Sequence, residues 1–113
     1  MKFDLKTAYA TYKECYLITE HKNSARAVDI YIWNDEDGPI VGLTRMIPAR
    51  ENPKIDAAYG KNAAFVDTNN LPEAMQLIQQ LNLGTFTGVQ ERNGFCEYPL
   101  VLFNMEEVGK YTE

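Results

Sequence analysis

The stretch AVDIYIWNDEDGPIVGLTRMI, residues 27–47, constrains the fold more than any other part of the chain. Its first half alternates strictly, with aliphatic side chains at one set of positions and polar or aromatic side chains at the other: Val28, Ile30 and Ile32 against Asp29, Tyr31 and Trp33. Such alternation is typical of a β-strand buried on one face. Turn-forming residues follow at 34–39, and apolar residues return at 40–47. This order predicts a β-hairpin with a loop of about five residues.

Two other regions have strand character. Residues 12–21 alternate with apolar side chains on both faces, which indicates a central strand. Nearer the C-terminus, the pair Asn93-Gly94 is a strong hairpin signal, and residues 85–92 and 95–103 on either side of it are rich in strand-forming side chains. The sequence therefore predicts a second hairpin around this pair.

Residues 71–83 are predicted to form the main helix. Asn70 is placed to cap it, Pro72 fits its first turn, Glu73 completes an Asn-x-x-Glu box, and Gly84 offers a left-handed stop. Apolar residues recur at helical spacing and are expected to face the core: Leu71, Ala74, Met75, Ile78 and Leu81, with Leu77 beside them. The opposite face is polar but uncharged and is interpreted as solvated, with a partner contact as the alternative: Gln76, Gln79, Gln80 and Asn82.

These elements predict an α+β fold, in which an antiparallel sheet of about four to six strands is built from hairpins and one main helix packs on one face. A chain of 113 residues can bury a core of its own, so residues 1–113 are expected to form a single domain. Residues 48–62 contain two prolines, a glycine and several charges, and they form a long connection with room for a short helical turn.

The chain is acidic, with a net charge of −5 at pH 7. An acidic protein gains little from counterion release, so direct nucleic-acid binding is disfavoured. Arg45, Arg50 and Lys54 come closest to a basic patch; contact with phosphate is one interpretation, and we favour a solvated loop. Apolar runs stay below the about 18 residues that cross a bilayer, so no membrane partner is expected and a cytoplasmic location is predicted. Cys15 and Cys96 would remain thiols there.

Signals for catalysis are weak in this sequence. Cys96 would need an adjacent base, and the single histidine, His21, lies on or at the end of a different predicted strand. Packing as a small buried hydrophobe is therefore the favoured role of Cys96. Ser24, the only serine, lacks a GxSxG context, and the sequence contains neither a phosphate-binding loop nor a common zinc motif. We nominate no catalytic residue, no metal site and no cofactor, and lean toward a protein that is not an enzyme.

The stretch LNLGTFTGVQERNGFCEYPLVLFN, residues 81–104, carries an Asn-x-Gly segment, a Thr-Gly pair, and Asn-Gly-Phe-Cys followed by Tyr-Pro-Leu and an aromatic residue. It resembles the C-terminal signature of a family of small uncharacterised bacterial proteins, a domain of unknown function, found in mobile elements of Gram-positive gut bacteria. The resemblance brings no assigned activity and no site residues. It implies a small intracellular accessory protein of a plasmid, phage or conjugative element, and some proteins of this kind act on host defence or regulation.

Tyr31 and Trp33 determine what the first hairpin can do. If no helix covers their face, the hairpin presents two aromatic side chains beside the acidic turn of Asp35, Glu36 and Asp37, an arrangement that suits a protein interface. Core packing of Trp33 is the alternative, and the sequence favours it.

For function, we predict a small acidic interaction protein that binds another protein, with a mobile-element-encoded modulator or inhibitor of a host protein as the specific version. The alternative is a small-ligand-binding domain, or an undetected enzyme with a cleft near residues 48–62. Assembly into a homo-oligomer stays open.

Overall fold

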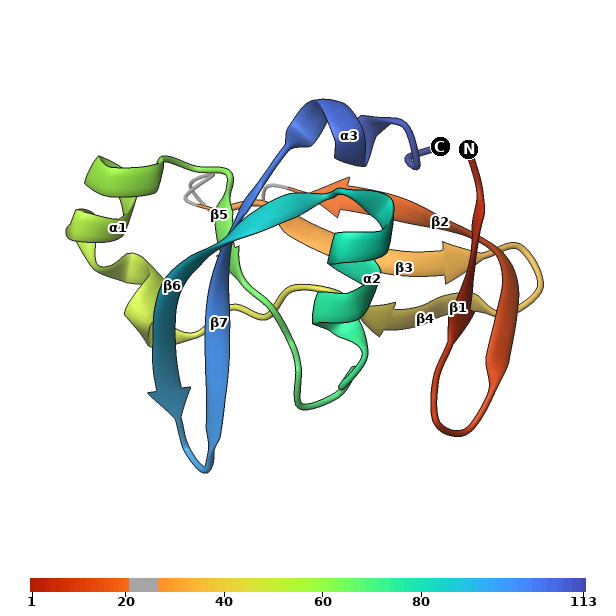
Figure 1. Ribbon diagram of the computed structural model, residues 1–113, viewed down its shortest axis with the longest axis horizontal. Coiled ribbons are helices and arrows are strands. Elements are labelled where there is room, and N and C mark those ends of the chain that lie inside the picture. Colours follow the sequence, from red (N-terminus) through yellow and green to blue (C-terminus); the bar gives the residue numbers. More distant parts are fainter. Residues whose placement is uncertain (21–26) are drawn as a thin grey trace.

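A computed structural model describes residues 1–20 and 27–113 (Figure 1). Strands and helices follow one another in the order β1 (Phe3–Lys6), β2 (Thr11–Glu20), β3 (Asp29–Asn34), β4 (Gly38–Gly42), the 3-10 helix η1 (Pro48–Glu51), α1 (Pro53–Tyr59), β5 (Ala63–Phe65), α2 (Ala74–Leu81), β6 (Gly84–Asn93), β7 (Cys96–Phe103) and α3 (Met105–Gly109). Two antiparallel sheets result, one in the order β1-β2-β3-β4 and one in the order β5-β7-β6.

The predicted α+β class is confirmed, and both predicted hairpins are present as β3–β4 and β6–β7. The strand expected at 12–21 is β2, a central strand, although His21 lies outside the described residues. The strands divide between two sheets because the last hairpin pairs with β5, beyond the 48–62 connection, and not with the first hairpin. A single sheet would have required the β6–β7 hairpin to pair with the β3–β4 hairpin.

A short seam joins the two sheets where β4 ends. Thr44 pairs with Val66 in an isolated antiparallel bridge. Beside it, the N–H of Arg45 donates to the Phe65 carbonyl at 2.8 Å. The first sheet therefore continues into the second through backbone hydrogen bonds.

Helix α2 supplies one side of the main core. In Figure 1 it lies in front of β3 and β4, between the β6–β7 hairpin and the β1–β2 hairpin. Its buried side chains meet the inward side chains of the first sheet, and the cluster includes Leu71, Ala74, Leu77 and Ile78 with Cys15, Leu17, Ile30 and Ile32. Met75 and Leu81, which were expected to point inward, are only partly buried at the edge of this cluster, whereas Leu77, which was placed beside them, is buried. The amide-bearing face at 76, 79, 80 and 82 is exposed, as predicted.

The predicted ends of this helix are wrong. Asn70 does not cap it, because a separate turn precedes α2 and puts Glu73 at the N-cap position, and the Asn70 side chain donates from Nδ2 to Asp67 Oδ2 at 2.8 Å. At the other end the left-handed residue is Asn82, with φ of 57°, and not Gly84. Gly84 begins β6, where a Cβ atom would lie 2.6 Å from the carbonyl oxygen of Leu102. Close strand packing, and not a helix stop, requires glycine there.

Residues 48–62 fold over the other face of the three-stranded sheet as η1 and α1, around a second core: Ile47, Ile55, Ala63, Phe65, Tyr98 and Leu100. Arg50 is buried beneath them. Its Nε donates to the Ala63 carbonyl at 2.8 Å, its Nη2 donates to the Gly60 carbonyl at 3.0 Å, and its Nη1 lies 2.8 Å from Asp56 Oδ1. The interpretation of Arg50 as part of a solvated basic loop is therefore wrong, because this side chain fixes the connection internally.

Candidate functional site

The outer face of the four-stranded sheet carries Tyr31 and Trp33, the aromatic side chains that the sequence suggested for a protein interface. On β3, Tyr31 and Trp33 are partly exposed, and the residues between and beside them are buried on the inner side. Strand pairing places Tyr16 of β2 opposite Trp33, and Ile18 opposite Tyr31. We call Tyr16, Ile18, Tyr31 and Trp33 the aromatic face. All four side chains belong to one continuous side of the sheet because paired residues in a sheet point the same way.

The aromatic face lies outside both hydrophobic cores found in the described residues. Helix α2 packs on the opposite side of the first sheet, and among the described residues the aromatic face belongs to no hydrophobic core and stays partly exposed. Core packing of Trp33, which the sequence favoured, is therefore wrong. The hairpin alternation specified two different faces correctly, but a single helix layer can cover only one of them.

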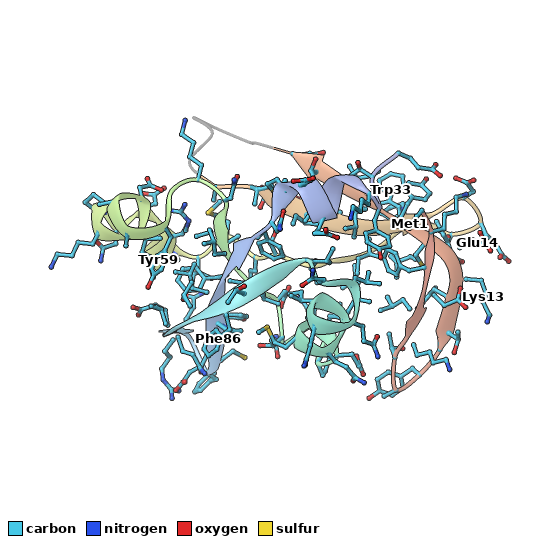
Figure 2. All side chains as sticks on the ribbon, turned by 45° about the horizontal axis from the view of Figure 1, so that its top comes forward. Met1, Lys13, Glu14, Trp33, Tyr59 and Phe86 are labelled. Atoms are coloured by element: carbon cyan, nitrogen blue, oxygen red, sulfur yellow. The ribbon has the colours of Figure 1, made fainter. Side chains whose placement is uncertain are left out.

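Lys2 connects the aromatic face to neighbouring carboxylates. Its Nζ lies 5.7 Å from the centre of the Tyr16 ring, 3.8 Å from Asp35 Oδ2 and 3.5 Å from Glu113 Oε1. The Glu113 carboxylate is the main cause that raises the pKa of Lys2 above its ordinary value, against partial desolvation. In Figure 2, Trp33 lies at the same end of the molecule as Met1 and Glu14, and Tyr59 lies at the opposite end. The chain terminus therefore borders this surface.

Tyr16 is held by the acidic turn. Its hydroxyl donates to Asp35 Oδ1 at 3.1 Å. Partial desolvation, followed by this contact with the carboxylate, raises the pKa of Tyr16 above its ordinary value. The aromatic face and the turn thus form one connected surface.

The buried side chain of Asn34 holds the acidic turn in place through hydrogen bonds. The loop of β3–β4 is shorter than expected, because Asn34 still pairs with Gly38 and three residues remain between them. Asn34 is buried, its Oδ1 accepts the N–H of Asp37 at 2.6 Å, and its Nδ2 donates to the Lys13 carbonyl at 3.2 Å. Gly38, with φ of 72°, supplies the left-handed residue that closes such a three-residue loop. Asp35, Glu36 and Asp37 are consequently exposed on a preorganised turn.

Tyr31 also has a structural role. A Cβ atom built on Gly42 of the neighbouring β4 would lie 3.8 Å from Cδ1 and 3.9 Å from Cε1 of Tyr31. The ring therefore covers the bare backbone of an edge-strand glycine, a known way to stabilise such a position. Trp33, which lies opposite Pro39, is the better probe of binding because this second role does not complicate it.

The two cysteines are free thiols in different environments. Cys15 is buried in the main core, where desolvation raises the pKa of its thiol. Cys96 lies at the start of β7, partly buried against the second core. His21 and Ser24 lie outside the described residues, so the Cys96–His21 pairing is not placed by the structure.

The cleft expected near residues 48–62 is a shallow hollow of about 320 Å³, lined by Met46, Ile47, Pro48 and Glu51. Glu51 is the one ionisable residue in its lining, whereas ligand sites usually gather several polar groups. In the described part of the chain, no group of three or more His, Cys, Asp and Glu side chains is close enough to hold a metal ion.

A different hollow lies between the β1–β2 hairpin and the start of α2, with Glu73 in its wall. Sequence reasoning missed it, since Glu73 was interpreted only as a capping residue. Its lining comes from residues 7–12, 40–41 and 70–73. A local sequence pattern cannot predict that these distant segments lie next to one another.

A sequence model for the family described as "Domain of unknown function (DUF4313)" matches residues 15–113. The chain belongs to this family. The DUF4313 region includes the aromatic face, the acidic turn and both hairpins, and it begins after β1. No curated protein and no solved structure matches the chain significantly. Among the described residues, every helix is too short or too polar to cross a membrane.

Proposed function

We propose that this protein is a non-catalytic interaction protein that binds a basic surface of another protein through the aromatic face and the acidic turn. The observation that supports the proposal is the position of Tyr16, Tyr31 and Trp33 outside both cores, beside three exposed carboxylates. Tyrosine and tryptophan dominate the energetics of protein interfaces, and adjacent charges steer association.

The proposed setting is a bacterial cytoplasm in which the protein, encoded by a mobile element, modulates or inhibits a host protein. The resemblance of residues 81–104 to proteins of mobile elements supports this setting, and the net charge of −5 supports a basic partner. The acidic run in the turn is only three residues long, so the proposal is a modest protein contact and not imitation of a nucleic-acid backbone.

Comparative capture from a bacterial lysate tests this function. Four baits are compared with the parent protein: Trp33→Ala, its control Phe95→Ala, the combined Asp35→Asn, Glu36→Gln and Asp37→Asn variant, and its charge-matched control with Glu51, Glu91 and Glu106 changed to Gln. Phe95 is fully exposed at the tip of β6–β7, and the three control glutamates are exposed elsewhere.

A partner should be retained by the parent and both controls, and lost or weakened with the other two baits. The captured partner should also dissociate more readily as salt rises, because exposed charges are screened. If every bait retains the same partners at each salt concentration, the first hairpin is not the interface and the proposed function is wrong.

A further inference from the structure

A hollow of about 350 Å³ opens between the β1–β2 turn, the edge strand β4 and the start of α2. Its wall is largely apolar, with contributions from Tyr12, Ile40, Val41, Leu71 and Pro72. This volume falls within the range of small-molecule sites. The hollow is separate from the aromatic face, because Leu71 belongs to the main core on the inner side of the sheet, and Ile40 and Val41 pack against that core.

Glu73 brings a carboxylate to this hollow. It also lines a second, more polar hollow of about 340 Å³ that contains Asp4, Lys6, Gln76 and Gln80. Glu73 Oε1 is buried and has neither a hydrogen-bond donor nor an ion pair among the described residues. Buried charged atoms elsewhere in the described part of the chain are paired: Arg50 Nη1 and Asp56 Oδ1 lie 2.8 Å from each other as an ion pair.

An unpartnered buried carboxylate oxygen is costly, so it favours any ligand that supplies a charged donor. The last torsion of a glutamate side chain is soft, so a small rotation can turn Oε1 toward the hollow. Asp4 does not compete for such a donor to the same degree, because its Oδ2 already lies 3.1 Å from Lys13 Nζ.

Tyr9 stands at the mouth of the hollow on a well-ordered turn. The N–H of Thr7 donates to the Ala10 carbonyl at 2.8 Å, and Thr7 Oγ1 accepts the N–H groups of Tyr9 and Ala10 at 3.2 and 3.1 Å. The Tyr9 side chain itself is 98% exposed. An exposed ring on a fixed turn can close over a bound cation, to which aromatic faces are attracted.

We propose that this hollow binds a small organic amine, with its protonated nitrogen at Glu73 and its apolar or aromatic body against Tyr12, Ile40, Val41 and Leu71. The charge of Glu73 selects a cation, and the largely apolar wall selects a body that is not itself polar. Lys6 is the internal competitor, because it lines the polar hollow that shares Glu73. This inference does not depend on the proposed protein interface, since the two sites share no residue.

The test is a titration of the isotopically labelled protein with 2-phenylethylamine, followed by backbone amide chemical shifts. 2-Phenylethanol, which has nearly the same shape without the charge, is the ligand control. The protein variants are Glu73→Gln, the charge-matched control Glu106→Gln on α3, and Lys6→Gln. The amide spectrum of each variant also reports whether it is folded.

The amine should shift amides of residues 9–12, 40–41 and 70–73. Its affinity should fall about tenfold or more in Glu73→Gln and stay unchanged in Glu106→Gln, because a charged hydrogen bond is lost only in the first. The alcohol should bind more weakly than the amine by a similar factor. Equal affinity for amine and alcohol, or no shifts in the parent up to the solubility limit, would overturn the proposal. So would amine binding that occurs only in Lys6→Gln, since Glu73 would then serve an internal ion pair.

Discussion

The guanidinium of Arg50 lies 2.8 Å from the Asp56 carboxylate, although only one of the two side chains is buried. The Arg50 side chain is 1% exposed and that of Asp56 is 39% exposed. Water can therefore partly replace the arginine at Asp56, but nothing in the described structure replaces it at the carbonyls of Ala63 and Gly60. This asymmetry makes Arg50, and not its partner, the centre of the 48–62 connection.

Arg50→Met should lower the free energy of unfolding by about 3 kcal/mol, because it leaves two backbone acceptors and a carboxylate without their donor. Asp56→Asn should cost less than half as much, since its side chain is already partly solvated. Lys54→Met on the exposed side of α1 should stay within about 0.5 kcal/mol of the parent and serves as the control. Urea unfolding measures all three, and a near-neutral Arg50→Met would contradict the structural role of this side chain.

The helix face can be checked with two adjacent residues. Ile78 is 3% exposed in the main core, and Gln79 is exposed. Ile78→Ala should destabilise the protein by about 2 to 5 kcal/mol through lost burial and a residual cavity, whereas Gln79→Ala should be near neutral. Chemical denaturation of both variants gives the comparison. Similar losses at both positions would mean that α2 buries a different face.

Two glycines provide a matched pair for strand and helix packing. Gly84→Ala should destabilise the protein by about 1 to 3 kcal/mol, because the added methyl group would meet the Leu102 carbonyl at 2.6 Å and Val101 Cγ1 at 2.8 Å. Gly109→Ala, at the end of α3 with no atom within 4 Å of the added group, should be neutral or stabilise by up to about 1 kcal/mol. Thermal unfolding distinguishes them, and the close β6–β7 contact would be refuted if Gly84→Ala were the more stable of the two.

The buried Cys15 thiol should make stability depend on alkaline pH. Desolvation raises its pKa in the folded state, so the unfolded chain releases this proton first as the pH rises. This contribution to stability is complete below the ordinary thiol pKa and declines as the pH rises toward the raised value. Urea unfolding of the parent and Cys15→Ala at neutral and alkaline pH isolates the effect. The parent should lose more stability than the variant over that interval, and parallel losses would show that Cys15 is not the cause.

The sequence predicted those features that depend on local patterns. The alternation at 28–33 placed Tyr31 and Trp33 on one face, and the Asn93-Gly94 pair marked the second hairpin, although the structure closes it with Asn93 opposite Cys96 and a turn at Gly94-Phe95. The apolar positions of α2 predicted most of its buried side. In each case the physical cause acts within a few residues of the pattern.

The features that were missed depend on contacts between distant segments. Asn70 has good capping chemistry, but its side chain donates to the Asp67 carboxylate in the turn after β5, and the helix begins only at Ala74. Arg50 resembled a solvated charge because its partners at 60 and 63 are backbone carbonyls, which any sequence supplies. The hollow at Glu73 exists only where the β1–β2 turn meets α2, so neither segment carries a sign of it.

The seam at Thr44 and Val66 has a consequence for amide hydrogen exchange. The N–H groups of Arg45 and Asp67 donate across it to the carbonyls of Phe65 and Leu43 at 2.8 and 2.9 Å. Because these bonds belong to both sheets, their amides should exchange with solvent only when the whole domain opens. A partner that binds the aromatic face would bind only the protein in which this sheet is folded, so it would stabilise the folded protein against opening. Binding should therefore slow amide exchange in β5 and β7, although these strands belong to the three-stranded sheet and the partner contacts only the four-stranded one.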